Sequence, residues 1–225
     1  MRGLLLSSYA AMAQGTPFQG GGATARFSLD TCNATVMGDC AISDCSSTNW
    51  VSAGVVTVKT SAGTWQLDPG TNNSYPTQSA QVPLFTAGEM MMFSAPGAMV
   101  PAFSGTLIAP GKPTLTSPAA GALTIDRSKD FSFAWSGGGG AEVWITMSAT
   151  ATPTKAISCH FAASAGHGVI PKAVLGALPA GAGSFGLSGF ATATKRAGDW
   201  DVSLMAFYSG VWPDGTMAAG QTTLQ

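Results

Sequence analysis

The sequence has little charge and almost no glutamate. Charged residues make up 9% of its 225 residues, against about 25% in an average soluble domain. Glutamate occurs only as Glu89 and Glu142, whereas threonine occurs 24 times. The missing residues are those that fill exposed helix faces, while threonine, valine and aromatic side chains suit a half-buried pleated surface. The composition therefore predicts an all-β protein with glycine and proline at its turns.

An excess of basic charge and a long apolar run are also absent. Ten Lys and Arg residues are balanced by eleven Asp and Glu residues, which leaves a net charge of −1. Without a basic stripe to neutralise phosphates, nucleic acid is excluded as a partner. No stretch approaches the roughly 20 apolar residues of a membrane-spanning helix, so no transmembrane segment is expected. A hydrophobic content of 45% with six Trp residues argues against disorder.

The N-terminal segment has the layout of an export signal. Met1–Ala13 contains one basic residue, a short apolar run and the small-x-small triplet that ends at Ala13. Glycine-rich residues follow, so residues 1–24 are predicted to be a signal-like segment and a flexible leader. The predicted location is therefore secreted or at the cell surface.

Four cysteines are compatible with an oxidising compartment. Cys32, Cys40 and Cys45 lie close together, and Cys159 lies far along the chain. We expect structural disulfides among them, with at least one inside the trio and Cys159 either buried as a small apolar residue or bonded to the remaining member. A zinc site is the competing interpretation, but no Cys-x2-Cys pair is present, so no metal and no other cofactor is predicted.

Alternating apolar residues locate the strands. Ile157, Cys159 and Phe161 are expected to face inward, with Ser158 and His160 facing outward. The one expected helix covers Pro171–Leu178. The remaining predicted strands are Ala25–Thr31, Cys40–Cys45, Val51–Thr60, Thr64–Leu67, Glu89–Ser94, Gly105–Ile108, Ser184–Ala193 and Trp200–Tyr208.

Two modules are expected, joined at Ile108–Pro113, where two prolines and a glycine interrupt the pattern. The first covers residues 25–109 and the second covers residues 110–225. In the second, Pro113–Gly121, Phe131–Trp135 and Gly140–Met147 resemble the first three strands of a fibronectin type III or immunoglobulin-like module. This resemblance implies a β-sandwich and no particular function. The whole chain is also similar in texture to uncharacterised exported bacterial proteins. The fold prediction is thus two immunoglobulin-like or fibronectin type III-like β-sandwich modules with one short helix.

Aromatic residues near turns are the best lead to a binding site. Trp50 and Trp212 lie beside turns, and Tyr75 lies in a polar loop. A loop aromatic can stack on a sugar ring or anchor a protein partner. The alternative is that these rings cap the open ends of the sandwiches.

Catalysis is not expected from this sequence. Only His160 and His167 offer an imidazole base, and no G-x-S-x-G nucleophile motif is present. We therefore predict an exported, non-catalytic structural or adhesive protein whose partners are other surface proteins or glycans. A carbohydrate-binding module that uses Trp50, Trp212 and Tyr75 is the alternative, and a secreted hydrolase that depends on His167 is the third hypothesis.

Overall fold

The computed structural model describes residues 2–13, 17–29, 33–44, 49–80, 82–139, 142–150 and 155–225. For residues 2–13, 17–20, 33 and 44 it describes the backbone alone. Strands account for 59% of the chain, they form several antiparallel sheets, and the described residues include one short α-helix. The all-β class that the composition predicts is therefore confirmed.

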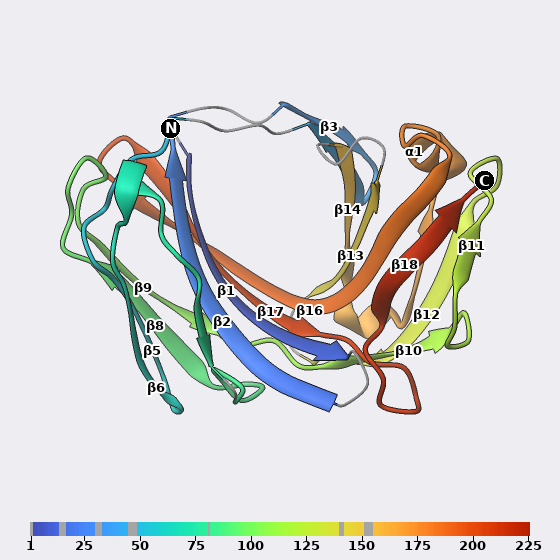
Figure 1. Cartoon of the computed structure of the whole chain (residues 1–225), viewed down its shortest axis with the longest axis horizontal. Coiled ribbons are helices and arrows are strands. Elements are labelled where there is room, and N and C mark those ends of the chain that lie inside the picture. The colour runs from blue at the N-terminus through green and yellow to red at the C-terminus, as the bar shows by residue number, and fades with distance from the viewer. Residues whose placement is uncertain are drawn as a thin grey trace. The chain divides into compact units, whose positions relative to one another are not determined.

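Two compact units interleave along the sequence (Figure 1). Unit 1 comprises Met1–Thr31, Ser47–Pro110 and Phe190–Tyr208, and unit 2 comprises Cys32–Ser46, Gly111–Gly189 and Ser209–Gln225. The chain passes from unit 1 to unit 2 after Pro110, which lies within the linker expected at Ile108–Pro113. Each unit is nevertheless assembled from three chain segments, whereas the sequence predicts two continuous modules over residues 25–109 and 110–225. The reason is strand pairing between segments that lie far apart in sequence.

Unit 1 contains two β-sheets. One has the strand order β6-β5-β8-β9, and the other has the order β17-β1-β2-β7. The strands are β1 (Arg2–Ala13), β2 (Pro17–Ser28), β5 (Val56–Thr60), β6 (Gly63–Leu67), β7 (Gln78–Ala80), β8 (Met90–Ala95), β9 (Phe103–Ile108) and β17 (Trp200–Ser209). β16 (Gly181–Ala197) adds its last eight residues to this unit and the rest to unit 2.

The N-terminal segment lies within a sheet of unit 1. β1 pairs in parallel with β17 and antiparallel with β2. Residues 2–13, which carry the export-signal pattern, and residues 17–24 of the expected leader are thus strand residues. Removal of Met1–Ala13 on export stays a prediction.

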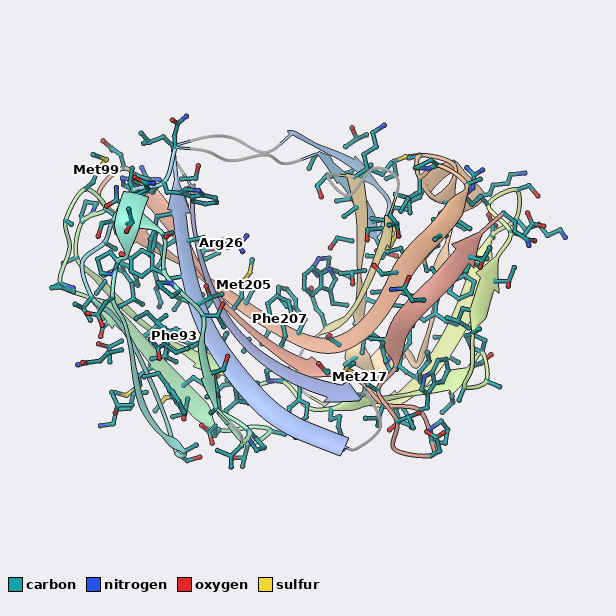
Figure 2. All side chains as sticks on the ribbon, viewed as in Figure 1. Arg26, Phe93, Met99, Met205, Phe207 and Met217 are labelled. Carbon is teal, nitrogen blue, oxygen red and sulfur yellow. A yellow bond between two sulfur atoms is a disulfide. The ribbon has the colours of Figure 1, made fainter. Side chains whose placement is uncertain are left out.

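The core of unit 1 is formed by apolar side chains from both of its sheets. Phe93 on β8 is 1% exposed and is labelled in Figure 2. The ring of Phe27 on β2 lies 6.0 Å from the ring of Phe103 on β9. Arg26 and Met205 extend from the opposite face of β2 and β17, which is the outer face of that sheet (Figure 2). Burial of large aromatic rings between the two sheets stabilises both sheets.

Unit 2 contains a three-stranded sheet with the order β10-β12-β15 and a larger sheet in which β3, β4, β14, β13, β16, β18 and β11 are successive neighbours. Its elements are β3 (Asn33–Met37), β4 (Cys40–Asp44), β10 (Pro113–Ser117), β11 (Leu123–Ile125), β12 (Phe131–Gly137), β13 (Glu142–Ala149), β14 (Lys155–Ala162), β15 (His167–Ile170), α1 (Lys172–Leu175) and β18 (Ala219–Leu224). β16 pairs antiparallel with β18, which pairs in parallel with β11.

The alternation expected in the second half of the sequence is confirmed. Trp135 is 4% exposed, stacks on Phe133 with ring centres 5.5 Å apart, and donates its indole N–H to the carbonyl of Ala163. Cys159 and Phe161 on β14 belong to the same buried cluster. These residues join the two sheets of unit 2 into one core.

Three boundaries differ from the predictions. The helix is shorter than expected and begins directly after Pro171, which lacks the N–H that a first helical turn leaves unpaired. The strand expected from Val51 begins at Val56, because Gly54 has a φ of 78° and interrupts the extended backbone. β16 continues to Ala197, so that Gly198, with a φ of 58°, forms the turn into β17.

Candidate functional site

Two of the three aromatic residues proposed as a binding site are buried. Tyr75 and Trp212 are each 6% exposed. Trp50 is half-buried, and its ring lies 6.0 Å from the guanidinium carbon of Arg26. Burial at this level disfavours ligand stacking on the Tyr75 and Trp212 rings and agrees better with the alternative that loop aromatics pack inside their modules. Ligand binding by these loop aromatics stays a prediction for Trp50.

Tyr75 is buried because its hydroxyl organises the backbone of unit 1. The hydroxyl donates to the carbonyl of Gly54 at 2.8 Å and accepts from the backbone N–H of Ala53 at 2.9 Å. The Ser52 hydroxyl lies a further 3.2 Å away, and the ring packs edge-on against Phe27. The role that these contacts support is structural, since a buried tyrosine must satisfy its polar end.

The cysteine prediction is settled for one pair. Cys40 on β4 and Cys159 on β14 are directly opposite each other in the antiparallel ladder and form a disulfide. Cys159 is therefore bonded to a member of the N-terminal trio and is fully buried. Cys32 and Cys45 lie outside the described residues. No cluster of three potential metal ligands occurs among the residues that the structure describes.

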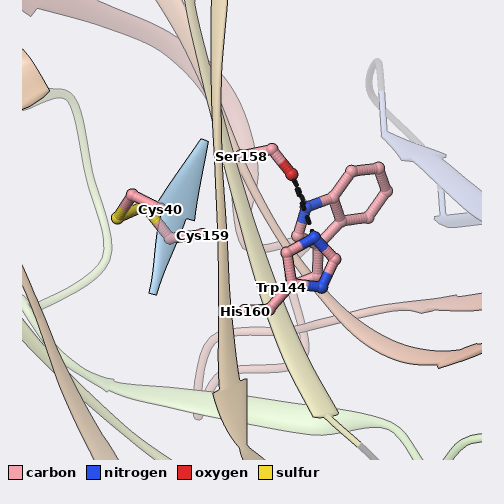
Figure 3. Close-up of a disulfide and its surroundings, with 5 residues drawn as sticks. All are labelled: Cys40, Trp144, Ser158, Cys159 and His160. Atoms are coloured by element: carbon pink, nitrogen blue, oxygen red, sulfur yellow. Dashed lines mark hydrogen bonds between the residues drawn. A yellow bond between two sulfur atoms is a disulfide. The ribbon is translucent and has the colours of Figure 1, made fainter. Parts of the chain in front are cut away.

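Opposite this disulfide, the outer face of β13 and β14 carries a compact polar and aromatic cluster. Figure 3 shows Cys40 and Cys159 on one side of β14, and Trp144, Ser158 and His160 on the other. Because side chains alternate along a strand, the burial of Cys159 directs both of its neighbours outward. The four members, named here the Trp144 cluster, are Glu142, Trp144, Ser158 and His160.

The strand register brings these side chains together. Trp144 is directly opposite His160 in the β13–β14 ladder, and the two rings stack with centres 5.5 Å apart and planes 29° apart. The indole N–H of Trp144 donates to the Ser158 hydroxyl. His160 Nε2 lies 3.2 Å from Ser158 Oγ, and His160 Nδ1 lies 3.0 Å from Glu142 Oε2. The His160 and Glu142 side chains are 35% and 47% exposed.

The hydrogen bonds of the Trp144 cluster have one consistent direction. A carboxylate only accepts, so His160 Nδ1 carries the proton that faces Glu142. In neutral His160, Nε2 then accepts from the Ser158 hydroxyl, which itself accepts from Trp144. The result is a continuous chain from an indole donor to a carboxylate acceptor, which holds all four side chains in fixed orientations.

A serine, a histidine and a glutamate in this order also have the spacing of a nucleophile, a base and an orienting acid. Acyl transfer additionally needs N–H donors that are directed at a developing oxyanion. Ser158 lies in a central strand that pairs with Thr146 on one side and with Ala41 on the other. Its backbone polar groups are therefore engaged in the ladders, and the Trp144 N–H is directed at the serine hydroxyl itself. In this geometry the Ser158 hydroxyl is engaged with both Trp144 and His160.

Both histidines line one open depression of about 370 Å³ next to the cluster. His160 contributes from β14 and His167 from the start of β15, together with Asp39 and Val169. His167 Nδ1 lies 2.9 Å from the carbonyl of Ala165. The sequence singled out the two histidines as possible bases but gave no signal that they share a surface.

Comparisons with known proteins give no family. No protein-family model matches the chain, and no curated protein matches it. Among solved structures, one similar chain is described as the "Crystal structure of tetra-tandem repeat in extending region of large adhesion protein". The match has 17% sequence identity and a TM-score of 0.23, and covers 91% of this chain and 48% of the other. The chain thus spans about half the length of that chain. A TM-score this low does not establish a shared fold.

None of the described helices is both long enough and apolar enough to cross a bilayer.

Proposed function

We propose that this chain is an exported, non-catalytic adhesive or structural protein of the cell surface that needs no cofactor. Its partners in this proposal are surface glycans or other surface proteins. In this proposal the two units are immunoglobulin-like or fibronectin type III-like sandwich modules. The contact of Phe27 with Phe103 in unit 1 and the contact of Phe133 with Phe161 in unit 2 support this assignment, because each pair joins strands of two different sheets.

The observation that carries the proposal is the Trp144 cluster. It places an aromatic ring, a hydroxyl, an imidazole and a carboxylate on the outer face of a sheet. Val143, which lies between Glu142 and Trp144 in the sequence, and Cys159, which lies between Ser158 and His160, are buried on the opposite face. Recognition groups on a rigid sheet lose little conformational entropy on binding, which favours affinity.

The disulfide supports an extracytoplasmic location. Bonds of this kind persist in oxidising compartments and are rare where glutathione keeps thiols reduced. Cys40 and Cys159 are separated by 119 residues, so their bond joins the short β3–β4 hairpin to the rest of unit 2. This is the type of cross-link that stabilises a low-charge, glycine-rich chain outside the cell.

The test is deletion and complementation in the organism that encodes the chain. We expect the protein in the surface or secreted fraction, and reduced attachment of the deletion strain to surfaces or to other cells. Complementation with the wild-type gene should restore attachment, and with the Trp144→Ala gene should not. A cytoplasmic protein, or attachment that is unchanged by the deletion, would contradict the proposal.

Two alternatives have separate tests. A carbohydrate-binding module that uses Trp50 would lose glycan binding on Trp50→Ala and keep it on Trp144→Ala. A secreted hydrolase would turn over an ester or glycoside substrate, with loss of turnover on His167→Ala or Ser158→Ala. Either result would replace the proposed function by its alternative.

A further inference from the structure

We infer that the outer face of β8 in unit 1 carries a binding site for copper(I), formed by the thioethers of Met90 and Met92. This inference is independent of the adhesive function and of the Trp144 cluster. A thioether sulfur is a soft, polarizable donor, so it selects soft monovalent ions such as copper(I) over harder divalent ions. A thioether pair also differs in its donors from clusters of His, Cys, Asp and Glu, of which the described residues contain none with three members.

The first step concerns the direction of the three consecutive methionines of β8. Exposed and buried side chains alternate along the whole strand. Met90 and Met92 are 58% and 43% exposed, whereas Met91 between them is fully buried in the core of unit 1. The alternation therefore places two thioethers together on the outer face of the sheet and one in its interior.

The second step concerns the spacing of the two exposed thioethers. Residues two apart on one strand have Cα atoms about 6.6 to 6.8 Å apart, and their side chains extend from the same face. Each methionine side chain has three rotatable bonds, so the two sulfurs can lean toward each other and hold one ion between them. Copper(I) accepts two donors in a linear arrangement. β8 pairs with β5 on one side and with β9 on the other, which fixes the backbone that carries the pair.

The third step concerns the neighbours of the pair on the same sheet face. Ile108 is directly opposite Met90, and Thr106 is directly opposite Met92. Neither side chain offers the anionic oxygen that hard divalent ions prefer. On the other side, Lys59 is directly opposite Met92. Its ammonium group repels a divalent ion twice as strongly as a monovalent ion, so the surroundings of the pair favour copper(I) over divalent metals.

The fourth step separates a metal site from an apolar docking patch. Met90, Met92 and Ile108 also form a small exposed apolar surface, and methionine is enriched at protein interfaces. A docking patch depends on the area and shape of its side chains, so leucine can replace methionine there at little cost. A metal site depends on the sulfur lone pairs, which leucine lacks. Substitution of leucine for the two methionines therefore distinguishes the two roles.

The experiment is calorimetric titration of the full-length, oxidised protein with silver nitrate in chloride-free buffer, since silver(I) is an air-stable substitute for copper(I). Thiols are first blocked with iodoacetamide, because thiolates bind silver(I) more tightly than thioethers do. We expect one site with a Kd of about 0.1 mM or tighter. Met90→Leu and Met92→Leu should each weaken binding by about tenfold or more, because a single thioether loses the advantage of chelation. The double variant should lose the site.

Two matched controls keep the pair intact. Met91→Leu changes the buried methionine between the two ligands. Met99→Leu changes a methionine that is 62% exposed, is labelled in Figure 2, and has Gly97 and Pro101 two residues away on either side. Both controls should bind silver(I) as the wild type does. Circular dichroism would show that each variant is folded.

A spectroscopic measurement assigns the ligands and the metal. In ¹H–¹³C spectra of the methionine methyl groups, the signals of Met90 and Met92 should shift on addition of silver(I). Copper(I) kept reduced by ascorbate should shift the same two signals, and zinc(II) should not.

Four outcomes would overturn the inference. The first is the absence of silver(I) binding at about 1 mM, and the second is a double variant that binds as tightly as the wild type. The third is a loss of affinity in Met91→Leu or Met99→Leu as large as that in Met90→Leu. The fourth is a failure of copper(I) to shift the Met90 and Met92 signals, or an equal shift by zinc(II).

Discussion

The two units fasten distant parts of the chain in different ways. Unit 1 holds the loop around Tyr75 against residues 52–54 by hydrogen bonds to a single buried hydroxyl. Unit 2 holds β4 against β14 by a covalent bond between Cys40 and Cys159. The Tyr75 hydroxyl holds its loop only because hydrogen-bond partners surround it, and these partners bury it inside unit 1. A disulfide needs only the inner face of its strand, so the neighbouring residues on the outer face remain available for binding.

This comparison predicts where function is placed. The hydrogen bonds of the buried Tyr75 hydroxyl are the tether of unit 1. They involve an interior residue and place no functional group on the surface. The tether of unit 2 is the Cys40–Cys159 disulfide. Cys159 lies between Ser158 and His160 in the sequence, and the side chains of these two neighbours belong to the Trp144 cluster. Covalent stabilisation from behind permits a polar outer face, because the strand does not depend on that face for its attachment to the core.

Loss of the disulfide should have the largest effect. The double variant Cys40→Ala/Cys159→Ala leaves no free thiol at either position. The chain-entropy model for a separation of 119 residues gives a loss of about 4 to 5 kcal/mol in the free energy of unfolding. Urea unfolding measures the loss, and hydrogen exchange should locate it in unit 2. A loss below about 1 kcal/mol, or one confined to unit 1, would show that the tether is not important.

Trp135→Ala should cause the second-largest loss in the free energy of unfolding. Trp135 is 4% exposed and packs on Phe133 and Phe161, so its removal should cost about 3 to 5 kcal/mol in unit 2. Trp144→Ala is the matched control, because the same residue type is half-buried on the outer face, and it should cost much less. Equal losses in the two variants would contradict the assignment of inner and outer faces.

Tyr75→Phe tests the tether of unit 1. It keeps the ring but removes the hydroxyl, which leaves the buried N–H of Ala53 without that acceptor. The expected loss is about 1 to 3 kcal/mol, measured by urea unfolding and located in unit 1 by hydrogen exchange. A neutral result would mean that the loop around Tyr75 is held by ring packing alone.

The smallest effect should come from Glu89, at the start of the β8 hairpin in unit 1. Partial burial acts to raise the pKa of its carboxyl from 4.5, but hydrogen bonds from Ser61 and Thr86 outweigh it and lower the pKa. A lowered folded-state pKa stabilises the fold above the unfolded value, and this stabilisation is lost as the pH falls from about 4.5 through the lowered pKa.

Because Glu89 is only partly buried and its carboxyl lies at the surface, its contribution should stay below about 1 kcal/mol. Urea unfolding of the wild type and of Glu89→Gln between pH 6 and about pH 3 measures it. The difference between the two proteins should be present at pH 6 and shrink in acid. A difference that grows as the pH falls would contradict the sign of the shift.

The inner faces of the strands could be read from the sequence, but the candidate site could not. Alternation along one strand is a local property, so the inward positions of Trp135 and Cys159 and the outward positions of Ser158 and His160 followed directly. Trp144 belongs to another strand, and its contact with His160 depends on the β13–β14 register. The loop that connects these strands contains no turn motif that would fix the register. The parallel pairing of β1 with β17 was equally hidden, because the partners lie at opposite ends of the sequence.

The aromatic residues near turns illustrate the same limit. Their position beside turns suggested exposure, but Trp212 and Tyr75 are buried by segments from elsewhere in their units. A loop residue is exposed only if no distant segment covers it, and sequence neighbours do not report this.

The most direct test of the account is attachment of the purified, fluorescently labelled chain to cells of the organism that encodes it. Wild type, Trp144→Ala and Trp50→Ala should be compared at equal concentration in the oxidised state. The account predicts that the wild type and Trp50→Ala attach equally and that Trp144→Ala loses most of its attachment. Equal attachment by all three proteins, or attachment of the wild type no greater than that of an unrelated labelled protein, would contradict it.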